Sequence, residues 1–172
     1  MKKIFIVKCM LVCITLAYGQ DIHPDYTITD KLSHQCSPVL SQGKTGTCWS
    51  FSTTSFIESE IIRLGNGNHN LSELFQVRNI YLDKAQNYIL RKGNDQFGQG
   101  ALAHDVLKSI DKYGVIPNEV YNGFSISGET TYDHDQMVTL LKAMVDTAVN
   151  SKMLSKNWWE SYNAVLDVYI GK

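Results

Sequence analysis

The chain has 172 residues, of which 44% are hydrophobic, 10% aromatic and 19% charged. This composition is ordinary for a globular protein and excludes the disordered, collagen-like and low-complexity classes. The 16 basic and 17 acidic residues give a formal net charge of −1. Because no basic stripe is present, nucleic acid is not expected as the main partner.

The first 19 residues have the layout of a secretory signal peptide. Met1-Lys2-Lys3 is a short basic start, an apolar run extends to Leu16, and Ala17-Tyr18-Gly19 supplies small residues for cleavage. The run is too short to span a membrane as a helix. We therefore expect export to the periplasm or the extracellular space, with no membrane association after cleavage. A buried N-terminal strand and an uncleaved anchor are the alternatives.

Cleavage at that point would leave two cysteines, Cys36 and Cys48. A disulfide between them is possible in an exported protein, although a free thiol is favoured. No CxxC pair is present for zinc. Asp133-His134-Asp135 has metal-binding residue types, but a solvated turn and helix cap explains it better. We expect no metal and no cofactor.

The remaining sequence predicts a mostly helical protein with no strands. Residues 20–47 form a lead-in that ends in a polar glycine-containing turn, SQGKTGT at 41–47. Ser72 is a good N-cap, and Gly114 a good C-terminal cap. Apolar spacing then predicts five helices, over residues 48–64, 72–92, 102–113, 135–154 and 157–170. Much of the first of these helices is expected to be buried.

One segment carries chemistry, because it places a thiol at the start of a helix. Cys48 begins the first predicted helix, and the partial positive charge of a helix N-terminus favours the nucleophilic thiolate. Gln42 lies six residues earlier. Its side-chain amide and the backbone N–H of Cys48 could together hold an oxyanion. The alternative is a small buried cysteine at a helix start, which is a common structural arrangement.

Gln42-x5-Cys48-Trp49-Ser50-Phe51 resembles the active-site segment of papain-like cysteine peptidases. Thr45 and Thr47 depart from the C-G-[SA]-C-[WY] signature of the classical members. The longer string QGKTGTCWSFS is similar to the bleomycin hydrolase and aminopeptidase C branch. Further similarity lies in three later segments: Leu71-Ser72-Glu73, Phe97 to Val106, and Lys112 to Pro117.

The resemblance implies a role for each matching residue. Cys48 would be the nucleophile, Gln42 the oxyanion donor, and Trp49 would pack beside the active-site helix. The predicted substrate-binding residues are Gly46, Trp49, Gly100 and Ala101. Gly100 and Ala101 fall where the family has a Gly-Gly pair whose backbone pairs with the substrate main chain. Ala101 departs from the Gly-Gly pair of the family, so it adds a methyl group to a tight cleft and would disfavour a positive φ.

The resemblance also implies an α+β papain-like fold, of which residues 48–172 would be the helical half. The family's β-rich half, with its catalytic His and Asn, has no counterpart in this sequence. None of the mature histidines fits the place of the base; these are His23, His34, His69, His104 and His134. We therefore expect a cysteine peptidase acting on peptides, aminopeptidase-like, whose catalytic His and Asn belong to a longer chain or to a separate polypeptide half. A homo-oligomer is the other partner that we consider. The alternative is a non-catalytic remnant that binds peptides or another protein.

Overall fold

The computed structural model describes residues 32–125, 128, 130–151 and 153–172. The predicted signal peptide, the first part of the lead-in and His23 lie outside the described residues. The chain divides into two units, Met1–Ser33 and His34–Lys172. All the helices described below belong to the second unit.

The described residues form five helices, at the five places where the sequence predicted them. Their bounds are α2 Cys48–Arg63, α3 Glu73–Leu90, α4 Ala103–Tyr113, α5 Asp135–Asn150 and α6 Trp158–Ile170. The prediction for α5 was four residues too long. Its last carbonyls are taken by the side chains of Asn150, on Asp146 O at 2.9 Å, and Ser151, on Thr147 O at 2.7 Å. Ser151 is already extended, with ψ 138°.

Ser72 and Gly114 cap two helix ends, as the sequence predicted. The hydroxyl oxygen of Ser72 accepts a hydrogen bond from the backbone N–H of Phe75 at 3.0 Å, which caps α3. Gly114 ends α4 with φ +79°, a backbone conformation that favours glycine.

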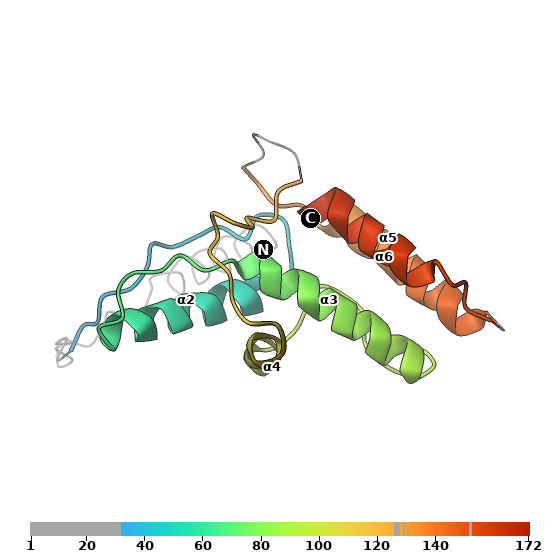
Figure 1. The fold of residues 1–172 in the computed structure, drawn as a ribbon, viewed down its shortest axis with the longest axis horizontal. Coiled ribbons are helices and arrows are strands. Elements are labelled where there is room, and N and C mark those ends of the chain that lie inside the picture. The colour runs from blue at the N-terminus through green and yellow to red at the C-terminus, as the bar shows by residue number, and fades with distance from the viewer. Residues whose placement is uncertain (1–31, 126–127, 129, 152) are drawn as a thin grey trace, which may run out of the picture. The chain divides into compact units, whose positions relative to one another are not determined.

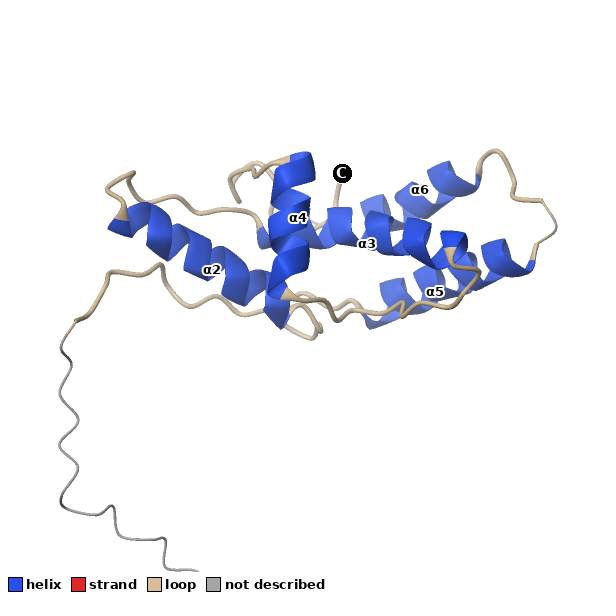
Figure 2. Ribbon diagram, turned by 90° about the horizontal axis from the view of Figure 1, so that it is seen from below, coloured by secondary structure: helices blue, strands red, loops and turns tan. Residues whose placement is uncertain are grey.

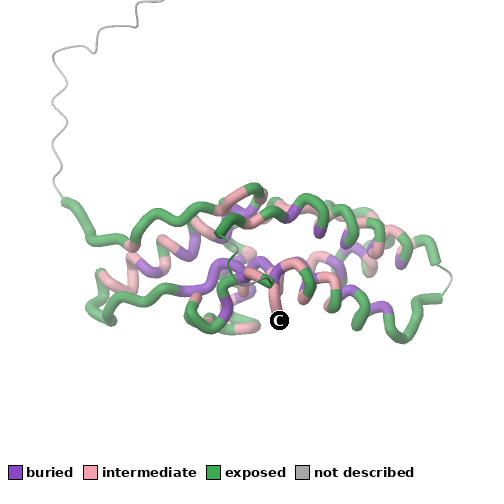
Figure 3. Tube along the Cα trace, turned by 90° about the horizontal axis from the view of Figure 1, so that it is seen from above, coloured by how far each residue is buried: buried purple, intermediate pink, exposed green. Residues whose placement is uncertain are grey.

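α3 is the central element, because each of the other four helices contacts it. α4, seen end-on in Figure 1, lies against both α2 and α3, and α5 and α6 lie side by side as a hairpin on α3 (Figures 1 and 2). Figure 3 shows the buried stretches where helices face one another. The largest fully buried side chains of this core are Tyr81, Tyr162, Leu74, Met137, Leu141 and Leu166.

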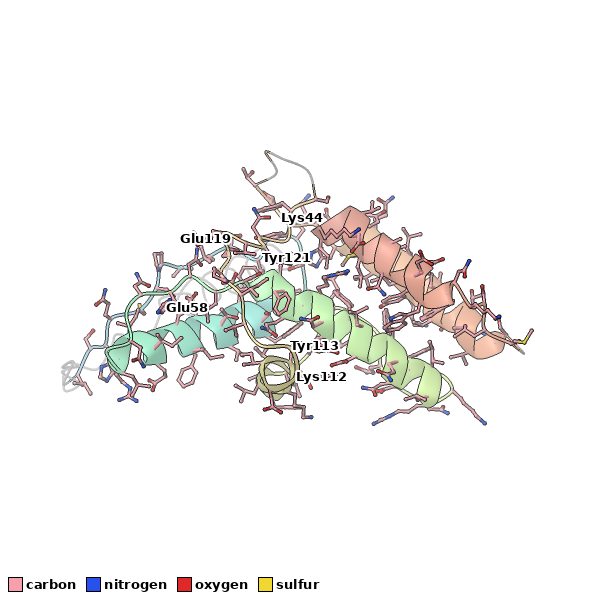
Figure 4. All side chains as sticks on the ribbon, viewed as in Figure 1. Lys44, Glu58, Lys112, Tyr113, Glu119 and Tyr121 are labelled. Atoms are coloured by element: carbon pink, nitrogen blue, oxygen red, sulfur yellow. The ribbon has the colours of Figure 1, made fainter. Side chains whose placement is uncertain are left out.

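α4 is fixed to α3 by a polar contact at its C-terminal end. The ammonium of Lys112 and the hydroxyl of Tyr113 both donate to Asp83 Oδ1 of α3, each at 2.7 Å. Figure 4 shows the labelled Lys112 and Tyr113 beside α3. The carboxylate raises the pKa of Lys112 by accepting its hydrogen bond. This contact holds α4, and therefore the loop that precedes it, against the central helix.

Less of α2 is buried than the sequence predicted, and its buried residues are mostly polar. Apart from Trp49, its buried residues are polar: Ser50, Thr53, Thr54 and Glu58. Phe56, an apolar residue of the same helix, is 65% exposed. Apolar spacing therefore located the helix but not the face that it buries.

No strand occurs among residues 32–172 where the structure is described (Figure 2). Two isolated bridges are present, a parallel one between Lys44 and Asp133 and an antiparallel one between Leu71 and Pro117. Within the same residues no helix is long and apolar enough to cross a membrane. The described unit is thus a helical domain in which short backbone pairings fasten the loops.

Candidate active site

Cys48 is the first residue of α2, and its side chain is exposed. The two residues that follow are buried and anchor the start of the helix. The hydroxyl of Ser50 donates to Glu73 O at the start of α3, at 2.9 Å. The indole Nε1–H of Trp49 donates to Gln99 O at 2.9 Å. A fixed helix start with an exposed thiol is the arrangement expected of a nucleophilic cysteine.

The turn before Cys48 is closed by reciprocal hydrogen bonds between Gln42 and Thr45. The amide Nε2 of Gln42 donates to Thr45 O, and the hydroxyl of Thr45 donates to Gln42 O at 2.8 Å. The hydroxyls of Thr45 and Thr47 lie 2.5 Å apart. These contacts hold the half-buried Gln42 side chain folded over its own turn, where one of its two amide hydrogens is already used.

A second segment, residues 131–134, lies directly against this turn. The backbone N–H of Lys44 donates to Tyr132 O at 2.7 Å, and that of His134 donates to Lys44 O at 3.4 Å. Gly43 has φ +63°, and a Cβ there would lie 2.5 Å from Tyr132 O. Only glycine allows the two backbones to approach this closely. Lys44, whose backbone pairs with Tyr132 and His134, is labelled in Figure 4.

Gly100 and Ala101 lie in the loop before α4, and the ammonium of Lys84 holds that loop in place. Lys84 Nζ donates to Gly98 O at 2.8 Å and also to Gly100 O. Burial lowers the pKa of Lys84. Ala101 has no positive φ, and a Cβ at Gly100 would meet nothing within 4 Å among the described atoms. The backbone conformation therefore accepts alanine at position 101.

This loop also borders a cavity of about 730 Å³. Its wall includes Lys84, Gly100 and Ala101, together with the carboxylates of Asp95 and Asp105. The volume is within the range of small-ligand sites. The two predicted substrate-binding residues of this loop thus line a space that is open to a ligand.

The structure brings the predicted site residues together in two neighbouring pieces. Gln42, Gly46, Cys48 and Trp49 form the turn and the start of α2. Gly100 and Ala101 follow Gln99 directly, and Gln99 hydrogen-bonds to Gly46 and Trp49. Gln99 and Lys84 were not identified from the sequence. A polar residue between two glycines, Gly98-Gln99-Gly100, was the available signal for Gln99.

None of the described histidines hydrogen-bonds to Cys48. His34 is exposed, His69 pairs with Asn66 O at 2.9 Å, and His104 lies 3.2 Å from its neighbour Asp105. His134 was expected on a solvated turn, but only 1% of it is exposed. Both of its ring nitrogens are buried without a described partner. Burial lowers the pKa of His134 to about 4, although Asp133 and Asp135 act in the opposite direction.

The structure also bears on the possible disulfide between Cys36 and Cys48 and on a possible metal site. Cys36 and Cys48 are both free and exposed, so the structure has no disulfide between them. In the part of the chain that is described, no group of three or more His, Cys, Asp or Glu side chains could hold a metal ion. The thiol of Cys48 is thus free to react.

Comparison with known families agrees with this geometry. The family model for papain family cysteine proteases matches residues 25–160, which include the turn, α2, the Gly100 loop and most of the helical unit. The chain therefore belongs to the papain family of cysteine proteases. No curated protein matches the chain.

Proposed function

We propose that this protein is a cysteine peptidase of the bleomycin hydrolase and aminopeptidase C branch, exported through residues 1–19. Cys48 attacks a peptide carbonyl carbon and forms a thioester as the C–N bond breaks. The amine leaves with the proton that the thiol gave up, and water then hydrolyses the thioester. The amide of Gln42 and the backbone N–H of Cys48 hold the oxyanion.

One observation carries this proposal: the thiol is exposed at the first residue of a helix whose start is held on both sides. Trp49 and Ser50 tie that start to Gln99 and Glu73. The glutamine that would supply the oxyanion donor stands in the turn directly before it. Gly100 and Ala101 then offer backbone groups and a cavity to the peptide chain.

The proposed reaction also needs a base for the proton of Cys48. No described histidine reaches the thiol, and His134 is buried in its neutral form. We place the base on the β-rich half of the papain fold, supplied either by a longer form of this chain or by a second polypeptide. The imidazole would take the thiol proton and return it to the leaving amine.

The test is hydrolysis of fluorogenic peptides by the purified chain, alone and with added candidate partner halves. Aminoacyl coumarins report aminopeptidase action, and N-blocked peptidyl coumarins report endopeptidase action. Cys48→Ser should abolish hydrolysis, and Cys36→Ser should leave it unchanged. Gln42→Ala should lower kcat by about 10²- to 10³-fold, as expected for an oxyanion donor. Hydrolysis that survives Cys48→Ser would refute the proposal.

A peptide-binding module without catalysis is the second candidate. It is favoured by the absence of any described histidine beside Cys48. It predicts that peptides bind to the chain, as measured by fluorescence anisotropy, with equal affinity in wild type and Cys48→Ser. It also predicts that no partner produces hydrolysis.

A further inference from the structure

Gln99 connects three segments that are far apart in the sequence. Its side-chain Oε1 accepts from the backbone N–H of Gly46 at 2.5 Å, in the turn before Cys48. Its Nε2 donates to Asp135 Oδ1 at 2.9 Å, in the first turn of α5. Its backbone carbonyl accepts from Trp49 Nε1 at 2.9 Å, in the first turn of α2.

The chemistry of these contacts requires an amide at position 99. Gly46 presents a donor and Asp135 presents an acceptor, so one side chain must accept at one atom and donate at the other. Among side chains of this length only glutamine does both without a charge. The packing is equally close, because a Cβ at Gly46 would lie 2.9 Å from Gln99 Cβ.

We infer that Gln99 is a positioning residue for the reactive thiol. It holds the glutamine-bearing turn and the start of α2 in register with each other and with the first turn of α5. The catalytic meaning of this role rests on the proposed peptidase function. Its effect on the reactivity of Cys48 is a property of the chain itself and can be measured without a substrate.

An exchange of hydrogen-bonding groups between Gln99 and Asp135 isolates this role. Gln99→Glu keeps the size of the side chain and the acceptor for Gly46, but it sets a carboxylate against that of Asp135. Asp135→Asn alone keeps an acceptor oxygen for Gln99 Nε2. The double variant Gln99→Glu/Asp135→Asn restores a donor facing an acceptor, with the polarity reversed. Gln86→Glu, at an exposed position on α3, controls for the added charge.

The readout is the rate at which iodoacetamide alkylates Cys48 in the full chain at pH 7. Trypsin releases Cys48 in peptide 45–63 and Cys36 in peptide 32–44, so each thiol is quantified separately by mass spectrometry. The Cys36 rate normalises every sample. Cys48 is already exposed, so a change in its alkylation rate reports how the helix start holds the thiol and not its access to the reagent.

We expect Gln99→Glu to slow Cys48 alkylation about two- to fivefold. Asp135→Asn and Gln86→Glu should stay within about 1.3-fold of wild type, and the double variant should return to that range. Hydrogen exchange of the Gly46 amide, followed by NMR, should accelerate in Gln99→Glu and recover in the double variant. Rescue by the second substitution separates positioning from a general loss of stability.

Gln99→Met is the second variant, because it keeps the length of the side chain and removes both hydrogen bonds. It should slow alkylation, and Asp135→Asn should not rescue it. An unchanged Cys48 rate in Gln99→Met, or a double variant no faster than Gln99→Glu, would overturn the inference. If the chain hydrolyses no peptide while the rescue is observed, the proposed function fails and the positioning role of Gln99 stands.

Discussion

The carboxylate of Glu58 accepts a hydrogen bond from the backbone N–H of Leu71 at 2.8 Å, and both residues are buried. This contact joins the polar buried face of α2 to the segment that leads into α3. Leu71 also forms the isolated bridge with Pro117, which follows α4. One glutamate therefore fastens the junction of three helices. Figure 4 labels Glu58 on α2.

Removing the Glu58 carboxylate should destabilise the fold substantially. Glu58→Ala leaves the buried N–H of Leu71 without its acceptor, at a cost of about 2–3 kcal/mol. Glu60→Ala is the matched control, because Glu60 lies on the same helix in an exposed pair with Arg63, where the loss should be much smaller than that of Glu58→Ala. Urea unfolding followed by circular dichroism measures both. Equal losses would contradict the assigned role of Glu58.

Glu73 should make the stability fall as the pH rises through the weakly acid range. Burial raises the pKa of Glu73 to about 7, and the nearby carboxylate of Glu58 adds to the shift, although a hydrogen bond to its own backbone opposes it. The folded state then holds a proton that the unfolded state has lost, between about pH 4.5 and 7. The loss over that window is at most about 3 kcal/mol. Glu73→Gln should remove this slope from the urea unfolding series.

His134 should produce the opposite slope over an overlapping range. Its pKa is lowered to about 4 by burial, against an unfolded value near 6.5, so the unfolded state binds the proton first. Stability is then lost as the pH falls from about 6.5 to 4.

In wild type the two slopes partly cancel, and His134→Leu should expose the slope of Glu73. Because both ring nitrogens lack a described partner, His134→Leu should not destabilise the chain at pH 5. A wild-type slope that neither substitution changes would contradict both assignments.

The helices could be predicted from the sequence because their signals are local. Apolar residues recur at helical spacing, Ser72 caps α3, and Gly114 ends α4, each within a few residues of the feature that it sets. Cys48 and Gln42 were proposed as site residues in the same way, since the motif that contains them is continuous. The end of α5 was missed because two side chains, on Asn150 and Ser151, close it where no glycine or proline marks a stop.

The contacts that hold the site could not be predicted, because they join residues far apart in the sequence. Gln99 meets Gly46 across 53 positions, and Lys84 holds the carbonyls of Gly98 and Gly100, which lie 14 and 16 residues later. Nothing in the local pattern around His134 separates a solvated turn from a buried one, since its burial depends on the segments packed over it. The polar face of α2 is buried for the same reason: Glu58 and Ser50 find their partners near the start of α3.

Gly43 offers a direct test of how closely the turn before Cys48 must approach residues 131–134. Gly43→Ala forces an L side chain into φ +63° and places its Cβ 2.5 Å from Tyr132 O, which cannot move away without breaking the Lys44 N–H bond to the same oxygen. The φ penalty alone is about 1–2 kcal/mol. Gly65→Ala is the matched control, since Gly65 has φ +77° with nothing within 4 Å. We expect Gly43→Ala to lose clearly more stability in urea than Gly65→Ala. Only Gly43→Ala should accelerate hydrogen exchange of the Lys44 amide and slow the alkylation of Cys48. If both variants behaved alike, the cost would come from φ alone, and the close approach of the two backbones would have no part in holding the turn.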